Sequence, residues 1–307
     1  MGQLALTVLV TWFVVDRLGP GFQELRGLDP SAWRPRLVPA LASCILLLLA
    51  YFWSAALWGR LVLDLGGPRV PVADAVRLFM VANLGRYLPG KVWQIAGLAV
   101  LARRRGVPAT TATAAAVLGQ GIALVAATLV GLGALAGGPP RFRSVGLAGA
   151  VIMGVVVLVG LLPPVFRRVA ALWFRLARQE APPGLGSVHA VRWLLYYTAN
   201  WALYAFSFWV LAASFGHAGR ILPVASAFAA AYVLGYVMIF APAGVGVREG
   251  FLVAFLTPQI GAAPSGVLAV VARIWTTLVE LVPAGAFWLR SLAGGDAVSG
   301  SSEDVRE

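Results

Sequence analysis

The fold is decided by residues 37–57, LVPALASCILLLLAYFWSAAL, in which no side chain carries a charge. A helix of about 20 apolar residues crosses the hydrocarbon core of a bilayer, which is about 30 Å thick. Comparable apolar runs recur along the chain at 112–135, 145–162, 194–215 and 267–289. The sequence therefore predicts membrane-spanning helices.

The composition of the 307-residue chain supports the same class. Hydrophobic residues make up 60% of it, charged residues only 12%, and the mean hydropathy is +0.85. Soluble domains have about 45–50% apolar and about 25% charged residues, so a soluble fold could not bury this much apolar surface. We expect an all-α polytopic membrane protein with a single transmembrane domain over 1–292 and a disordered cytoplasmic tail over 293–307. The run from Leu4 to Val15 is interpreted as a short uncleaved anchor.

The net charge of +12 comes from 24 basic and 12 acidic residues. The basic residues cluster in loops between apolar runs, without interleaved aromatic residues. Orientation in a membrane explains this distribution better than nucleic-acid binding does. Cys44 is the only cysteine and lies in an apolar run, which excludes an intramolecular disulfide and a cysteine-based zinc site. We predict no metal, no cofactor and no nucleic-acid partner.

Two regions interrupt the pattern of one helix per apolar run. Residues 72–105 carry Asn83, Arg86 and Lys91 near their middle, and residues 223–258 are interrupted at 241–249, APAGVGVRE. A charged side chain at mid-membrane costs about 2.5–3.5 kcal/mol on insertion scales. Irregular backbone is tolerated at that depth only where it lines an enclosed cavity. We therefore predict two broken re-entrant helical hairpins.

The other apolar segments are predicted to be six full spans. They lie at about 4–18, 37–59, 112–136, 144–163, 192–215 and 264–290. The side of this topology that is richer in arginine is assigned to the cytoplasm, together with both termini. Eight full spans with the N-terminus outside give a similar charge imbalance, so the polar residues of the broken regions decide between the two topologies.

The two broken regions also resemble each other in sequence. Val70-Pro71-Val72-Ala73 matches Leu222-Pro223-Val224-Ala225, and Pro89 then matches Pro242. In each copy a span, a broken segment and a second span follow in the same order. Three crossings separate the copies, which gives them opposite orientations. We predict an inverted repeat with halves of about 37–136 and 192–291, an arrangement found in many transporters.

Each break begins a new half-helix, whose free N–H groups and positive dipole end attract anions. Because cationic side chains lie beside both ends, we predict a mid-membrane site for a phosphate or another anionic head group. The residues assigned to head-group binding are Asn83, Arg86, Tyr87, Gly90, Lys91, Gly244, Gly246 and Arg248. Glu249, Arg273 and Glu280 are candidates for coupling or charge pairing. The alternative is that the cations only pair with these glutamates or extend to the interface.

Residues 83–93, NLGRYLPGKVW, and 242–249, PAGVGVRE, resemble the two signature regions of the flippase-like transmembrane domain of lysylphosphatidylglycerol synthases. The resemblance covers nearly the whole chain. It implies lipid translocation between the leaflets of the cytoplasmic membrane. No aminoacyl-transferase domain follows before Glu307, so we expect that the chain does not make the aminoacylated lipid itself.

The leading expectation is a flippase-like transporter of an anionic or zwitterionic phospholipid or of a polyprenyl-phosphate-linked lipid. Two alternatives stay open on the sequence: a membrane enzyme acting on lipid-linked sugars, with Glu249 or Glu280 as its base, and a non-catalytic partner of an envelope-synthesis enzyme. Whether the chain is an enzyme is undecided, with transport favoured. Membrane lipids are the expected partners, and a separate lipid-modifying synthase or glycosyltransferase is a candidate protein partner. The oligomeric state is not predicted.

Overall fold

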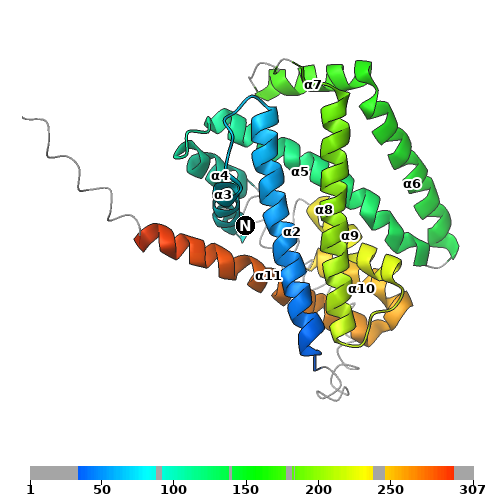
Figure 1. Ribbon diagram of the computed structural model, residues 1–307. Helices are drawn as coiled ribbons and strands as arrows, with labels where there is room; N and C mark the ends of the chain where they lie inside the picture. The colour runs from blue at the N-terminus through cyan, green and yellow to red at the C-terminus, as the bar shows by residue number, and fades with distance from the viewer. Residues whose placement is uncertain are drawn as a thin grey trace, which may run out of the picture.

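The computed structural model describes residues 34–87, 92–137, 140–177, 182, 184–237 and 246–293. Every regular element within these ranges is a helix (Figure 1). The prediction of an all-helical chain is therefore confirmed for the described residues. The expected N-terminal anchor and the tail from residue 294 onward lie outside the described residues.

Two long helices, α2 (Leu37–Asp64) and α8 (Ser187–Ser214), pack against each other through the middle of the molecule (Figure 1). The backbone N–H of Arg36, just before α2, donates to the carbonyl of the last residue of α8 at 2.8 Å. At the opposite end of the pair, Arg192 near the start of α8 lies 2.9 Å from the carboxylate of Asp64. The two helices are therefore antiparallel.

The first broken region forms a hairpin of α3 (Val72–Asn83), the short 3-10 helix η2 (Leu84–Tyr87) and α4 (Trp93–Arg103). At its open end, Asp74 pairs with Arg105 at 2.9 Å. The start of α3 and the end of α4 thus lie together, so the two half-helices are antiparallel. We call this element hairpin 1.

The second broken region forms hairpin 2, from α9 (Ile221–Val237) and α10 (Val247–Ile260). Gly219, just before α9, lies beside the last residue of α10, and Gly235 lies beside Arg248 in the first turn of α10. These contacts join the start of one helix to the end of the other, as in hairpin 1. Both predicted breaks therefore fold back on themselves instead of continuing in one direction.

Each hairpin closes over a glycine at its bend. A Cβ placed on Gly85 would lie 2.7 Å from the backbone nitrogen of Gln94, and one placed on Gly235 would lie 2.9 Å from the Cβ of Arg248. Such distances are too short for a side chain. The sequence therefore permits the close approach of the half-helices by leaving out the side chain at these two positions.

One long helix follows each hairpin: α5 (Ala109–Gly131), which continues into η3 (Leu132–Gly137), and α11 (Ala262–Ala293). α5 packs against α8 and α9, whereas α11 packs against α2 and α3. Each helix therefore contacts the hairpin of the other half of the chain. The element order, long helix, hairpin, long helix, is the same in both halves.

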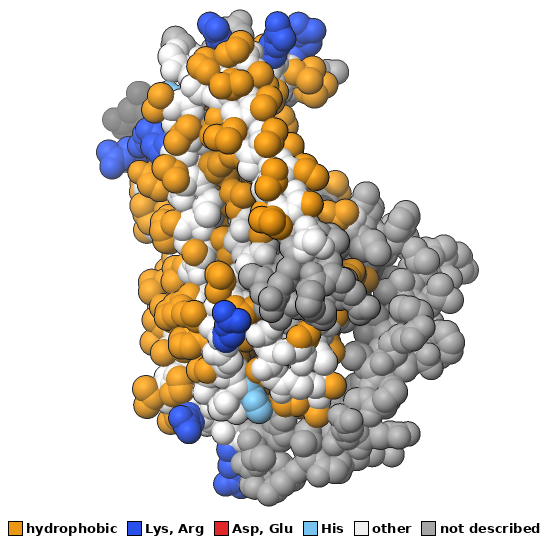
Figure 2. All heavy atoms as spheres, turned by 90° about the vertical axis from the view of Figure 1, so that its right-hand side faces the viewer, with side chains coloured by type: hydrophobic (Ala, Val, Ile, Leu, Met, Phe, Trp, Pro, Cys, Tyr) orange, Lys and Arg blue, Asp and Glu red, His pale blue; other side chains and the backbone are white. Residues whose placement is uncertain are grey.

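Two peripheral helices connect the halves. α6 (Pro140–Leu161) is followed after one residue by α7 (Pro163–Ala177), with a bend of 80° between them. Val169, Leu172 and Leu176 of α7 are exposed in the isolated chain. Figure 2 shows hydrophobic side chains over most of the described surface in that view, with basic side chains toward its upper end and others in its lower half. Such a surface matches a bilayer rather than water.

Within the described residues, three helical stretches are long and apolar enough to cross a membrane: Leu37–Asp64, Ala109–Ala134 and Ala262–Phe287. The bent pair of α6 and α7 is a fourth candidate. α8 is as long as α2 but is not among these candidates. The membrane class is thus supported by the structure, while the predicted span at 4–18 lies outside the described residues.

Candidate functional site

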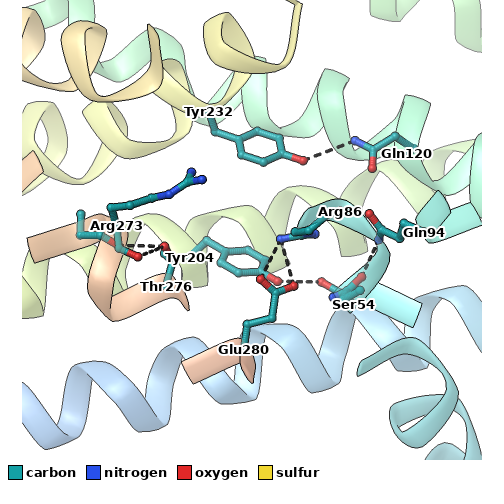
Figure 3. Close-up of polar contacts among 11 residues, drawn as sticks. Ser54, Arg86, Gln94, Gln120, Tyr204, Tyr232, Arg273, Thr276 and Glu280 are labelled. Atoms are coloured by element: carbon teal, nitrogen blue, oxygen red, sulfur yellow. Dashed lines mark hydrogen bonds and ion pairs between the residues drawn. The ribbon is translucent and has the colours of Figure 1, made fainter. Parts of the chain in front are cut away.

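Five charged side chains gather where the two hairpins meet α11, and we call them the central cluster. Arg86 comes from η2, Arg248 and Glu249 from the first turn of α10, and Arg273 and Glu280 from α11. Figure 3 shows Arg86, Arg273 and Glu280 in one region of the bundle interior, with Tyr204 and Tyr232 nearby. All five cluster residues were named from the sequence, and the structure brings them together from three separate elements.

Arg86 forms an ion pair with Glu280. Its Nη1 lies 3.1 Å from Oε1 and 3.3 Å from Oε2 of the carboxylate. The side chain of Arg86 is 32% exposed, whereas that of Glu280 is only 2% exposed. Removing the arginine would leave a buried carboxylate without this counter-charge, which typically costs about 3–5 kcal/mol. The pair therefore connects hairpin 1 to α11.

Glu249 closes the N-terminus of α10. Its Oε2 accepts a hydrogen bond from the backbone N–H of Gly246 at 2.7 Å, and its Oε1 lies 3.7 Å from Nη1 of Arg273. Gly246 has a φ of 82°, a conformation that favours glycine. The sequence assigned this helix end to an incoming anion, but in the structure a carboxylate of the chain itself already lies there and interacts with the helix dipole.

Arg248 has a different environment from the other two arginines. Its guanidinium carbon lies 4.6 Å from the centre of the Phe228 ring and 5.9 Å from the centre of the Tyr232 ring, both on α9. Among the described residues, no carboxylate lies within ion-pair distance of this guanidinium. Cation–π contacts stabilise the charge by about 0.5–2 kcal/mol but leave its hydrogen-bond donors available.

The cluster as a whole carries an excess of positive charge. In the part of the chain that the structure describes, it contains three arginines and two glutamates, so its formal charge is 3 − 2 = +1. Both glutamates are engaged by arginines other than Arg248. A single negative charge placed beside Arg248 would therefore neutralise the cluster, and intramembrane charges of this kind mark functional sites.

Polar side chains at the crossing of α2 and α8 lie next to the cluster (Figure 3). Nδ2 of Asn200 donates to Oγ of Ser54 at 2.7 Å, and Ser54 shares a hydrogen bond of 3.1 Å with the Tyr204 hydroxyl. The Tyr51 ring meets the Tyr204 ring edge to face, at 5.5 Å. Sequence analysis missed these four residues. Their signal was a polar side chain inside a predicted span, at Ser54 and Asn200.

A second polar contact borders the cluster on the side of α5. Nε2 of Gln120 donates to the Tyr232 hydroxyl at 3.5 Å, and the Tyr232 ring packs 4.6 Å from that of Trp201. Tyr232 thus lies between Arg248 and a polar side chain of α5. Sequence analysis missed both Gln120 and Tyr232.

The other predicted head-group residues fall in several places. Asn83 is fully buried, and its Oδ1 accepts a hydrogen bond from Gln94 across hairpin 1. Tyr87 is the last residue of η2. Gly90, Lys91 and Gly244 lie outside the described residues.

Neither histidine joins the cluster. His189 is in the first turn of α8, and His217 lies in the connection between α8 and α9. Partial burial lowers the pKa of His217, which favours its neutral form. Among the described residues, no group of three or more His, Cys, Asp or Glu side chains could hold a metal ion.

Comparison of the sequence with known protein families gave a match. The family model described as lysylphosphatidylglycerol synthase TM region matches residues 1–284. The chain belongs to this family. No curated protein and no solved structure gave a match.

The match to the lysylphosphatidylglycerol synthase TM region includes both hairpins in full, and it extends along α11 beyond Glu280. The whole central cluster therefore lies inside the family region. The family places the chain among membrane proteins connected with lipid handling.

Proposed function

We propose that this protein is a flippase-like lipid transporter of the cytoplasmic membrane. Its cargo is an anionic or zwitterionic phospholipid, or a polyprenyl-phosphate-linked lipid, which moves between the two leaflets. The head-group phosphate binds in the central cluster while the acyl or prenyl chains stay in the bilayer. Arg248 supplies the main contact, with Arg86 and the phenol of Tyr232 beside it.

The observation that carries this proposal is the guanidinium of Arg248, which lies in the bundle against aromatic rings. Charges inside a membrane protein are expensive and are usually paired. Arg86 and Arg273 follow that rule with Glu280 and Glu249. A site with one more arginine than it has carboxylates suits an anionic ligand, and a phosphate accepts hydrogen bonds from the fork of an arginine.

An inverted repeat is the second part of the proposal. It is supported by the same order of long helix, hairpin and long helix in both halves, and by the antiparallel packing of α2 with α8. The contact of α5 with α9 in hairpin 2 corresponds to the contact of α11 with α3 in hairpin 1, as two-fold symmetry between the halves would require. Rocking of one half against the other would then expose the cluster to each side in turn.

We further propose that both hairpins are re-entrant and that six full spans surround them, with both termini in the cytoplasm. With 12 residues in α3 and 14 in α10, these half-helices are about 18 and 21 Å long, shorter than the roughly 30 Å hydrocarbon core. Each hairpin would enter from one side and leave on the same side. A separate lipid-modifying synthase or glycosyltransferase that supplies the cargo is the partner we propose.

Transport can be tested with the full chain reconstituted in liposomes that contain a phosphatidylglycerol labelled with a fluorophore on its chain. Adding a membrane-impermeant quencher measures how fast the label changes leaflet. We expect Arg248→Gln to slow this exchange by at least about tenfold, because a hydrogen bond to a charged group contributes about 1.5–3 kcal/mol.

The matched control is Arg220→Gln, which removes an exposed arginine at the start of the same hairpin. It should leave the rate unchanged. Equal rates for the wild type, for Arg248→Gln and for protein-free liposomes would contradict the proposed function.

A further inference from the structure

Tyr51 of α2 is buried inside the bundle close to the central cluster. Its ring meets the Tyr204 ring edge to face at 5.5 Å. It also belongs to the same buried apolar cluster as Phe228, whose ring centre lies 4.6 Å from the guanidinium carbon of Arg248. Tyr51 therefore brings a phenol from α2 into the surroundings of the charged groups.

The phenol of Tyr51 lies within electrostatic range of both Arg86 and Arg248. These arginines belong to different hairpins, whereas Tyr51 belongs to the long helix that precedes hairpin 1. Tyr232 of α9 lies within range of the same two arginines. A small anion that contacts both guanidinium groups would therefore have one phenol from α2 and one from α9 as neighbours.

The hydroxyl of Tyr51 differs from those of the neighbouring tyrosines. Tyr204 shares a hydrogen bond of 3.1 Å with Ser54, and Tyr232 accepts one from Gln120 at 3.5 Å. In the part of the chain that the structure describes, the Tyr51 hydroxyl takes part in no hydrogen bond. Buried hydroxyl groups normally have a partner, and the ring of a phenylalanine would pack against Tyr204 in the same way. Packing alone therefore does not account for the hydroxyl.

The charges around Tyr51 decide which partner its hydroxyl can take. A guanidinium group has only N–H donors, so neither Arg86 nor Arg248 can accept the phenolic proton. Glu280 also lies within electrostatic range of Tyr51, but no hydrogen bond joins the two side chains. An anion held by the arginines can accept that proton, because a phosphate oxygen is a strong acceptor.

Arg86 can contribute to such a site without leaving Glu280. It contacts the carboxylate through Nη1 only, at 3.1 and 3.3 Å, and its side chain is 32% exposed although it lies in the bundle interior (Figure 3). A guanidinium has five N–H donors, so the others are available to an anion while the ion pair stays in place.

We infer that Tyr51 is a further head-group-binding residue, whose hydroxyl donates a hydrogen bond to the phosphate of a lipid bound by Arg86 and Arg248. This inference rests on the proposed function, because it needs a lipid phosphate at the cluster. All three side chains act as donors, which suits a group that accepts hydrogen bonds on every side. The site thus recognises the ionised phosphodiester of the cargo and rejects a lipid of the same chains that has no phosphate.

The test compares two probes on the full chain in detergent. One is a short-chain phosphatidylglycerol, and the other is a diacylglycerol with the same acyl chains and no phosphate. Tyr51→Phe removes the hydroxyl and keeps the ring. We expect it to weaken phosphatidylglycerol binding by about tenfold or more, because a hydrogen bond to a charged group is lost, and to leave diacylglycerol binding unchanged.

The matched control is Tyr197→Phe, which removes another buried hydroxyl. Tyr197 lies on α8 beside Gly119 of α5, and no charged group is within electrostatic range of it. This variant should bind both probes as the wild type does. Thermal unfolding of all three proteins in the same detergent checks that they are folded.

Equal affinity of the wild type and Tyr51→Phe for phosphatidylglycerol would overturn the inference while leaving the lipid site intact. An equal loss of affinity for both probes would also overturn it, since the effect would then come from packing and not from the phosphate. If the wild type does not prefer phosphatidylglycerol to diacylglycerol, the proposed function fails together with the inference. The failures are thus distinguishable.

Discussion

The three arginines of the central cluster are balanced by two kinds of group. Arg86 and Arg273 face carboxylates, whereas Arg248 faces the rings of Phe228 and Tyr232. The same residue type can therefore have a structural role at one position and a ligand-binding role at another. Substitutions should separate the two roles, because the loss of a structural pair lowers stability and the loss of a ligand contact does not.

At the residue scale we predict that Arg86→Gln lowers the free energy of unfolding by about 3–5 kcal/mol, because it leaves the Glu280 carboxylate without its arginine. Adding Glu280→Gln to that variant should restore most of the loss, since the buried charge is then gone. Thermal unfolding of the purified proteins in detergent measures both effects. If the double variant Arg86→Gln/Glu280→Gln has no higher free energy of unfolding than Arg86→Gln alone, the ion pair contributes little to stability.

The charged residues of the site could be predicted from the sequence, because a charge inside an apolar run has few structural explanations. Their pairing could not. Glu280 is 194 positions from Arg86. No local feature of the sequence indicates that Arg248, unlike Arg86 and Arg273, has no carboxylate partner among the described residues. Tyr51, Tyr204 and Tyr232 were not predicted to be part of the site, because a tyrosine in an apolar run usually indicates ordinary packing.

At the element scale, the sequence predicted both breaks because proline, glycine and charge coincide there. The exact start of each half-helix depended on tertiary contacts. α4 begins at Trp93, and its first turn packs against Gly85. The 80° bend between α6 and α7 could not be derived from local sequence.

The packing of α5 against hairpin 2 gives a prediction at the same scale. A Cβ on Gly131 would lie 2.9 Å from both Cα and N of Ala230 in α9, and backbone atoms cannot move aside as a side chain can. Gly131→Ala should therefore destabilise the fold by about 1–3 kcal/mol. Gly121 on the same helix has no atom within 4 Å of such a Cβ, so Gly121→Ala should be neutral or slightly stabilising. Equal melting temperatures for the two variants would contradict this account of the α5–α9 contact.

At the scale of the whole molecule, the inverted arrangement predicts which ends share a side of the membrane. In a Cys44→Ser background, Arg69→Cys and Arg104→Cys flank hairpin 1 and should react with a membrane-impermeant maleimide from one side. Arg220→Cys and Ala262→Cys flank hairpin 2 and should react from the other side. Labelling of intact and of inverted membrane vesicles measures this. If the two positions flanking either hairpin react from opposite faces, that hairpin is a full span and the proposed topology fails.

The central claim is that Arg248 holds a lipid phosphate inside the bundle. Native mass spectrometry with lipid extraction tests it most directly, on wild type, Arg248→Gln and Arg220→Gln purified in the same mild detergent, with folding checked by thermal unfolding. The account predicts that wild type and Arg220→Gln retain a phosphate-bearing lipid that Arg248→Gln has lost, and the mass of that lipid names the cargo class. Equal retention of the lipid by all three proteins, or no retained lipid in any of them, would contradict the claim.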